Sequence, residues 1–401
     1  MILTLDVYGT LVAASLVLLM GRKLVASVRP LRVYSIPEPV AGGLLVALGM
    51  LALHTATAVE LHFDSSLSAP LMLTFFACIG LNADLSSLRR GGAKLALFLG
   101  VVLGLLVVQN TLGLLLAKVL GISPLFGLLA GSISLAGGHG TAAAWSNVFS
   151  EKYGLDHAAE VGLACATFGL ILGGLIGGPL ANHLTKRVTL PDRATTGTEP
   201  GLFEQPDNIR LITAPAMIET LALIAVCLLG GQQIAALLRG SALELPAFVC
   251  TLFVGVLLRN GLGHLGLYQV FERAVSVMGN VALALFLSTA LMALRLWELA
   301  ALALPLLIVL ASQTALMLLY ARFITFRVMG GNYDAAVMAA GHCGFGLGAT
   351  PTAIANMQSV TDRHGPSHLA FLVVPVVGAF FIDIANASVI KLYLGLSILG
   401  G

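Results

Sequence analysis

The segment AAGHCGFGLGATPTAIANMQSVTDRHG, residues 339–365, decides how this chain folds. It belongs to an apolar region, 334–361, that is broken in its middle by glycines, which allow backbone conformations and close approaches that other residues do not. The pair Thr350–Pro351 has the pattern of a helix N-cap followed by proline at the first helical position. The segment is therefore predicted to form two helical arms around an irregular, glycine-rich turn.

An earlier segment, LLAGSISLAGGHGTAAAWSNVFSEKYG at residues 128–154, has the same character. It lies in a second glycine-broken apolar region, 122–150, and Thr141 is its predicted helix cap. The two segments match at a shift of 211 residues, so the chain is predicted to contain an internal repeat. The matched positions are Thr141 with Thr352, Glu151–Lys152 with Asp362–Arg363, Gly154 with Gly365, and His157 with His368.

The composition places these segments in a membrane. Hydrophobic residues make up 58% of the 401 residues and charged residues 10%, whereas a soluble domain carries about 25% charged residues. This excludes a soluble enzyme, a secreted module and a disordered chain, and a net charge of +2 offers no basic surface for a nucleic acid. The five cysteines lie in apolar stretches without a CxxC pair, so we interpret them as packing thiols, with no disulfide framework and no transition-metal site.

Ten apolar stretches are long enough to cross a bilayer, which takes about 20 helical residues. A polar linker, 185–209, separates five of them in an N-terminal half, 1–184, from five in a C-terminal half, 210–401. An odd number of spans in the first half places the second half in the opposite orientation in the membrane. We therefore predict an all-α polytopic membrane protein of two inverted repeats, each with a re-entrant helical hairpin between its fourth and fifth span. The stretches are about 2–21, 36–53, 67–83, 95–116, 158–182, 211–234, 242–258, 274–294, 299–321 and 368–390.

Lysine and arginine residues set the orientation, because they collect on the cytoplasmic side of short membrane loops. With the N-terminus outside and each broken region entering and leaving on one side, 16 of the 21 lysines and arginines lie inside. Both termini are therefore predicted to be periplasmic and the linker cytoplasmic. The five that lie outside are Lys118, Lys152, Arg239, Arg295 and Lys391.

The two broken regions are predicted to form a substrate site. Within a membrane, irregular main chain occurs only where protein or a water-filled cavity provides hydrogen-bond partners for its N–H and C=O groups. In secondary transporters built from inverted repeats, interrupted helices form the central binding sites. Helices that begin near the midplane present free N–H groups and a positive dipole end, which suits a carboxylate. The candidate substrate-binding residues are Gly137, Gly138, His139, Gly140, Thr141, Thr350, Thr352 and Asn356.

A cation site is predicted from an acid in the last span and from the carbonyl groups of the second glycine-rich turn. A buried acid in a span is costly and is by default a functional residue, and Asn386 follows Asp383 on the same helical face. The side-chain amides of Gln109, Asn110 and Gln313 are interpreted as groups that link helices through hydrogen bonds. The candidate sodium ligands are Asp383, Asn386, Gly344, Gly346 and Gly348.

These residues favour a secondary transporter and leave three alternatives. A cation/proton antiporter would use Asp383 as its titrating acid and would bind no amino acid. A channel would conduct downhill without saturable sodium dependence. A membrane-embedded enzyme is disfavoured, because the sequence has no HExxH, GxSxG or P-loop lysine motif and no paired acids within one span.

Long strings of the sequence resemble the bacterial glutamate:sodium symporter family, over essentially the whole chain except the linker. These strings are distributed over both halves and include both glycine-rich turns. They are YSIPEPVAGGLLVAL (34–48), FFACIGLNA (75–83), GGHGTAAAWS (137–146), FGLILGGLIGGP (168–179), FERAVSVMGN (271–280), YDAAVMAAGHCGFGLGATPTAIANMQ (333–358) and FLVVPVVGAFFIDIANA (371–387).

The resemblance implies both a fold and a function. Members of the family have two five-span domains in inverted orientation with glycine-rich re-entrant loops; the string 137–140 matches the first loop and 344–352 the second. The resemblance implies sodium-driven import of L-glutamate across the inner membrane, with Na⁺ as the coupling ion, no cofactor and no enzymatic activity. It also implies an elevator-type carrier that is a homodimer in the lipid bilayer.

Overall fold

A computed structural model describes residues 2–33, 36–57, 60–85, 92–186, 188, 211–241, 244–295, 297 and 302–395. Most of the predicted linker, 189–209, lies outside these residues. The described part is helical except for one short pair of strands and the connecting segments.

The N-terminal half contains the predicted spans and the first glycine-broken region. Its first helix begins at Val7, because the Asp6 side chain accepts a hydrogen bond from the Gly9 N–H at 2.8 Å and caps the helix there. The residues before Asp6 form β1, which pairs in parallel with β2, so the predicted span 2–21 begins later than the sequence analysis placed it. The elements are β1 (Ile2–Leu5), α1 (Val7–Ser27), α2 (Arg29–Val33), α3 (Glu38–Thr57), β2 (Glu60–Phe63), α4 (Ser68–Asn82), α6 (Gly92–Val119), α7 (Pro124–Leu128), η1 (Leu129–Ile133), α8 (Gly138–Tyr153) and α9 (Ala158–Thr185).

The C-terminal half ends in a bent span rather than a straight one. The part from His368 to Ala379 and the part from Ile382 to Leu394 meet at 48°, and the π-helical turn η6 and Pro375, which has no N–H to donate, lie at or before this bend. The elements are α10 (Ala214–Leu238), α11 (Ala247–His264), α12 (Glu272–Met292), α13 (Ala303–Tyr320), η5 (Ala321–Thr325), α14 (Phe326–Val328), α15 (Tyr333–Leu347), α16 (Thr350–His364), α17 (His368–Val376), η6 (Val377–Phe381) and α18 (Ile382–Leu394).

Most of the predicted spans are long helices. Eight helices of the described part are long and apolar enough to cross a membrane, and the bent pair α17–α18 makes a ninth. The remaining predicted span, 67–83, forms α4, which has 15 residues and is shorter than the roughly 20 needed for a full crossing. The prediction of an all-α, polytopic membrane protein is confirmed.

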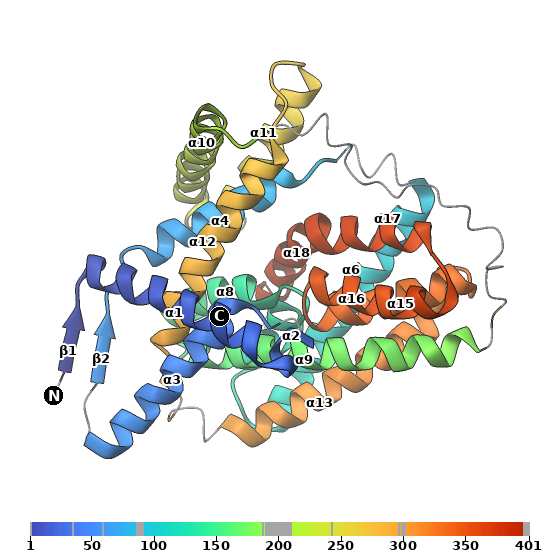
Figure 1. The fold of residues 1–401 in the computed structure, drawn as a ribbon, viewed down its shortest axis with the longest axis horizontal. Helices are drawn as coiled ribbons and strands as arrows, with labels where there is room; N and C mark the ends of the chain where they lie inside the picture. The colour runs from blue at the N-terminus through green and yellow to red at the C-terminus, as the bar shows by residue number, and fades with distance from the viewer. Residues whose placement is uncertain are drawn as a thin grey trace.

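The helices pack in two groups, and each group takes helices from both halves of the chain. In the first group α4 packs against α11 and α12, α3 packs against α1 and α12, and α10 packs against α11. In the second group α9 packs against α8, α15 and α16, while α6 packs against α7 and α13. Figure 1 shows α15, α16 and α17 above the long helix α9, with α10, α11 and α4 in a separate part of the view.

Glycines bring the helices of the first group into main-chain contact at matching places in the two halves. A Cβ atom at Gly21 of α1 would lie 2.0 Å from the Glu38 carbonyl oxygen of α3. A Cβ atom at Gly231 of α10 would lie 2.2 Å from Thr251 Oγ1 of α11. Gly21 and Gly231 are related by the 210-residue shift of the sequence repeat, so the first two spans of each half use the same device to pack. The five cysteines are buried, as their interpretation as packing residues predicts.

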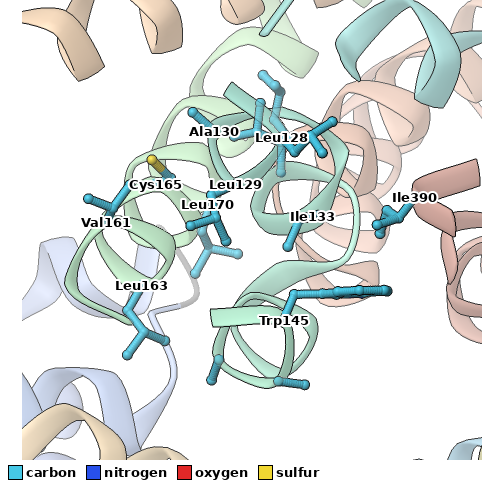
Figure 2. Packing of buried hydrophobic residues seen from close by; sticks show 14 of the residues in the cluster. Leu128, Leu129, Ala130, Ile133, Trp145, Val161, Leu163, Cys165, Leu170 and Ile390 are labelled. Carbon is cyan, nitrogen blue, oxygen red and sulfur yellow. The ribbon is translucent and has the colours of Figure 1, made fainter. Parts of the chain in front are cut away.

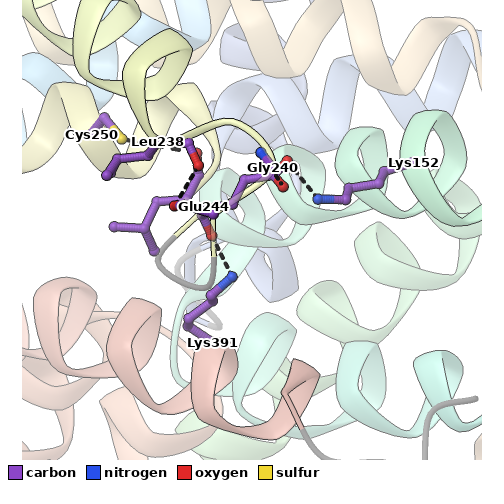
Figure 3. A network of polar contacts seen from close by, with 8 residues as sticks. Lys152, Leu238, Gly240, Glu244, Cys250 and Lys391 are labelled. Carbon is purple, nitrogen blue, oxygen red and sulfur yellow. Dashed lines mark hydrogen bonds and ion pairs between the residues drawn. The ribbon is translucent and has the colours of Figure 1, made fainter. Parts of the chain in front are cut away.

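A charged cluster joins the first group to α8 and α18 (Figure 3). Glu244, in the connection from α10 to α11, accepts a hydrogen bond from Lys152 Nζ of α8 at 2.6 Å. Its carbonyl oxygen accepts another from Lys391 Nζ of α18, and its side chain also accepts from the Gly240 N–H at 3.2 Å. The loop between α10 and α11 therefore bonds to one helix from each half of the chain, α8 and α18.

This cluster predicts a small, pH-dependent contribution to stability. The hydrogen bond from Lys152, and next the one from the Gly240 N–H, hold the pKa of Glu244 below its ordinary value. The contribution is complete above the ordinary glutamate pKa and is lost as the pH falls through the lowered pKa of the folded state. Because exposed ion pairs contribute little, Glu244→Gln should lower the midpoint of thermal unfolding at pH 7 by no more than about 2 °C.

The measurement is thermal unfolding of the purified protein, followed by intrinsic fluorescence at pH 7 and again at a pH well below the ordinary glutamate pKa. The difference between variant and wild type should disappear at the lower pH. Glu151→Gln, which removes an exposed carboxylate beside Lys152, is the matched control and should have no effect. An equal decrease at both pH values in Glu244→Gln would contradict this account of the cluster.

Candidate functional site

The second glycine-broken region forms the predicted hairpin. The Tyr333 hydroxyl, at the start of α15, donates to the Gly365 carbonyl oxygen just after α16. Ser367 Oγ donates to Asp334 Oδ1 at 2.6 Å. The chain therefore leaves the hairpin where it entered, and the turn between α15 and α16 is its far tip.

The two arms of this hairpin touch because one of them has a glycine at the contact. A Cβ atom at Gly344 of α15 would lie 2.5 Å from the main-chain nitrogen and Cα of Ala353 in α16. At the other end, Asn332 Oδ1 accepts a hydrogen bond from the Ala335 N–H at 3.0 Å and caps α15. The cap therefore fixes where α15 begins, and the close packing at Gly344 brings the two arms together before the turn.

The first glycine-broken region also turns back on itself, and it packs on α9 (Figure 2). Its first arm, α7 and η1, is broken at Gly131, which has a non-helical ψ of −138°. A Cβ atom at Gly162 of α9 would lie 3.5 Å from Leu129 Cδ2 of the first arm and 2.6 Å from Ser146 Oγ of the second. The two arms therefore lie at the same level of α9, and Trp145 of α8 belongs to the same buried cluster.

The tips of the two hairpins meet. Gly138, at the start of α8, has a φ of +68°, and a Cβ atom there would lie 3.4 Å from the Gly348 carbonyl oxygen at the second tip. The same first turn of α8 borders the first group, because a Cβ atom at Gly140 would lie 2.6 Å from the Phe75 ring of α4. Gly138 of the first turn and Gly348 of the second thus meet at the boundary of the two helix groups.

Helix α9 closes one side of the meeting point. A Cβ atom at Gly169 would lie 2.1 Å from the Leu347 carbonyl oxygen, and one at Gly348 would lie 3.0 Å from the Leu170 Cα. His139 Nε2 lies 3.0 Å from Thr167 Oγ1 on the same helix. The predicted residue His139 therefore has a fixed partner, and only a glycine fits α9 against the second tip.

The bent last span closes another side. Thr141 Oγ1 donates to Asp383 Oδ1 of α18 at 3.4 Å, so a predicted substrate residue and a predicted sodium ligand lie together. Thr350 Oγ1 donates to the Gly378 carbonyl oxygen of η6 at 2.8 Å. Because η6 and α18 are consecutive, the bend lets one span contact both hairpins.

The two predicted helix caps were wrong in detail. The N-cap residue of α16 is Ala349, one residue earlier than predicted, and α8 begins at Gly138, so that Thr141 lies within its first turn. In both cases the threonine hydroxyl has another partner, because the last span offers Thr350 a carbonyl oxygen and offers Thr141 a carboxylate.

Two of the predicted amides bond to the protein itself. Ser132 Oγ donates to Asn386 Oδ1 at 2.6 Å, and Asn386 Nδ2 donates to the Ser132 carbonyl oxygen at 3.0 Å. Asn356 Nδ2 donates to the carbonyl oxygens of Gly173 and Ala340, at 2.9 and 3.2 Å. Asn386 thus supports the break in the first arm, and Asn356 holds α16 against α9 and α15.

The carbonyl groups of the second turn differ in what they contact. The Gly344 oxygen accepts from the Ala349 N–H at 3.2 Å, and the Gly346 oxygen accepts from Gln109 Nε2 at 2.9 Å. The Gly348 oxygen faces the first tip. The Thr352 hydroxyl is buried and has no hydrogen-bond partner among the residues that the structure describes.

Sequence reasoning missed the partners that lie on other helices. Thr167, Ser132 and Gly378 contact the predicted residues, yet each lies in an apolar stretch without a motif of its own. A hydroxyl group inside an apolar span was the one signal available for Thr167 and Ser132. The Gly378 contact is made by a main-chain oxygen, which no sequence pattern distinguishes.

A family model described as sodium/glutamate symporter matches residues 3–366. This chain belongs to the sodium/glutamate symporter family. The sodium/glutamate symporter of Escherichia coli (strain K12) is 64% identical to it over 398 residues, which are 99% of this chain and 99% of that protein. The sodium/glutamate symporter of Haemophilus influenzae is 52% identical over 391 residues, 97% of each. The resemblance found in the sequence strings is confirmed, and the family is one of transporters.

The glycine contact within the second hairpin of this symporter-family chain can be tested directly. Gly344→Ala should destabilise the protein by about 1–3 kcal/mol, because the added methyl group would push two main chains apart. Gly261→Ala is the matched control: Gly261 lies in α11 with open space around it, so alanine should be neutral or slightly stabilising. Thermal unfolding of both purified variants measures the difference, and equal effects would show that the hairpin arms are not held by this contact.

Proposed function

We propose that this chain is a secondary active symporter that imports L-glutamate together with sodium across the bacterial inner membrane. Its relatives at 64% and 52% identity are named sodium/glutamate symporters and are matched over nearly their full length. The observation in the structure that carries the proposal is the convergence of two broken hairpins, from the two halves, at Gly138 and Gly348.

The hairpin tips are the binding site for the substrate. Helices α8 and α16 both begin there, so their free N–H groups and positive dipole ends favour a carboxylate. The segments 124–151 and 333–362 contain no lysine or arginine, so these helix ends supply the favourable charge. The Thr352 hydroxyl adds a donor that is already desolvated and needs no further ordering. Gly137, His139 and Gly140 shape the first tip.

Sodium binds beside the substrate, at Asp383 and Thr141. Their side-chain oxygens lie 3.4 Å apart on helices from opposite halves, and the Gly348 carbonyl oxygen is the part of the second turn that faces the first tip. Glutamate is a net monoanion at pH 7, so a negative-inside potential opposes its entry. Each sodium ion that accompanies it gains about 2.3 kcal/mol per 100 mV. One ion therefore offsets the substrate charge, and each further ion adds the membrane potential to the driving force for accumulation.

The transporter works by alternating access with two inverted repeats, 1–184 and 210–401, joined by a cytoplasmic linker. The paired packing of Gly21 and Gly231 supports the repeat, and the excess of lysine and arginine on one side supports periplasmic termini. The second helix group carries both tips, so it is the part that moves in an elevator mechanism. The first group is the fixed part and forms the homodimer in the lipid bilayer.

The decisive experiment is uptake of labelled L-glutamate into proteoliposomes that hold the purified chain. An inward sodium gradient should drive uptake, whereas an equal potassium gradient should not. Equal uptake with both ions would contradict sodium coupling and favour a uniporter or proton coupling. Sodium flux coupled to pH without glutamate dependence would instead support the cation/proton antiporter that uses Asp383.

The site assignment predicts which substitutions change the two half-saturation constants. Asp383→Asn should raise the sodium half-saturation constant about tenfold or more, because it removes a charged ligand worth at least 1.4 kcal/mol. Thr141→Val should raise the sodium constant severalfold, because Thr141 lies beside Asp383, and Thr352→Val should raise the glutamate constant severalfold. Thr220→Val, which removes a buried hydroxyl bonded within its own helix α10, is the control. Unaltered constants in the three site variants would exclude this site.

A further inference from the structure

Gln109 of α6 and Gln313 of α13 form a pair of fully buried amides in the second helix group. Gln109 Nε2 donates to the Gly346 carbonyl oxygen at 2.9 Å, and Gln313 Nε2 donates to the Gln109 main-chain oxygen at 2.8 Å. Because only the NH₂ end of an amide donates to a carbonyl, these bonds fix which end of each side chain is the oxygen. Neither Oε1 atom has a hydrogen-bond partner within the described part of the chain.

The two amides lie at the same level of facing helices. A Cβ atom at Gly346 would lie 3.0 Å from Leu105 Cδ2 of α6 and 3.0 Å from Met317 Sδ of α13. Gln109 follows Leu105 by four residues and Gln313 precedes Met317 by four, and the two glutamines are hydrogen-bonded to each other. Both therefore lie one helical turn beyond Gly346, in the same direction.

The end of α15 makes this place favourable for positive charge. The helix ends at Leu347, and its last carbonyl groups carry the negative end of the helix dipole. The Gly346 oxygen that Gln109 contacts belongs to this last turn. Ends of interrupted helices and free oxygen ligands are the elements from which transporters build sodium sites, and two buried oxygens beside such an end have the chemistry of a hard cation site.

We propose that Gln109 Oε1 and Gln313 Oε1 are ligands of a second coupling sodium ion, bound between α6, α13 and the end of α15. The inference rests on the sodium coupling proposed above and adds a site on helices other than those of Asp383 and Thr141. The ion satisfies two oxygens whose burial without a partner opposes folding. Two sodium ions and one glutamate monoanion carry one net positive charge inward, so the membrane potential then drives accumulation.

Thermal unfolding of the purified full chain tests the site without transport. The midpoint is measured without glutamate over a series of NaCl concentrations, with choline chloride holding the ionic strength constant, because an ion that binds the folded state stabilises it. Gln109→Met and Gln313→Met keep the side-chain length and remove the oxygen, and each should raise the half-effect sodium concentration at least tenfold. Thr220→Val should leave it at the wild-type value.

The outcomes separate this inference from the function on which it rests. If both methionine variants need the same sodium concentration as the wild type for half of the stabilising effect, the proposed site is overturned. The two amides would then only link helices, directly or through a bridging water. A wild-type protein with no sodium effect would overturn the sodium coupling itself. If the methionine variants do not fold, Gln313→Asn retains the amide but withdraws it by one methylene. A tenfold rise in the half-effect sodium concentration of Gln313→Asn would support the site, and an unchanged concentration would overturn it.

Discussion

An interrupted helix inside an apolar layer leaves main-chain groups that need partners, and much of the second helix group supplies them. The break in the first arm is supported by Asn110 Oδ1, which accepts from the Ser132 N–H at 3.0 Å, and by the two bonds between Ser132 and Asn386. The break in the second hairpin is supported by Gln109 through the Gly346 oxygen. Because such groups are costly to leave unpaired in a medium without water, these amides determine where irregular backbone can exist.

In the proposed function, the same constraint lets the site recognise a carboxylate without a fixed cation. The positive ends of α8 and α16 point their N–H groups at the meeting point of the tips, and these dipoles are fixed by the fold. In the proposed carrier, the partial charge at a helix end binds the substrate weakly enough to allow its release. Sodium at Asp383 then supplies the full charge that the helix ends lack, so that each ligand favours the binding of the other by reciprocal linkage.

The sequence was sufficient for the elements that depend on local composition. The long apolar helices, both glycine-broken hairpins and their internal repeat follow from hydrophobic runs, glycines and matched threonines. What it could not give is which helices become neighbours: that α9 contacts the second tip at Gly169, or that Thr350 bonds to Gly378 rather than capping α16. The strand pair at residues 2–5 and 60–63 was also missed. The first strand is apolar and runs directly into a span, and the second, Glu60–Phe63, is only four residues long and has no strand pattern of its own.

The central claim is that the two hairpin tips form one site in which glutamate and sodium bind together. The most direct test is calorimetric titration of the purified protein with L-glutamate, in sodium chloride and in choline chloride of equal ionic strength. The account predicts binding that weakens at least tenfold when choline replaces sodium, with Thr141→Val and Thr352→Val weakening the sodium-dependent binding. Equal affinity in the two salts, or wild-type binding in both threonine variants, would contradict it.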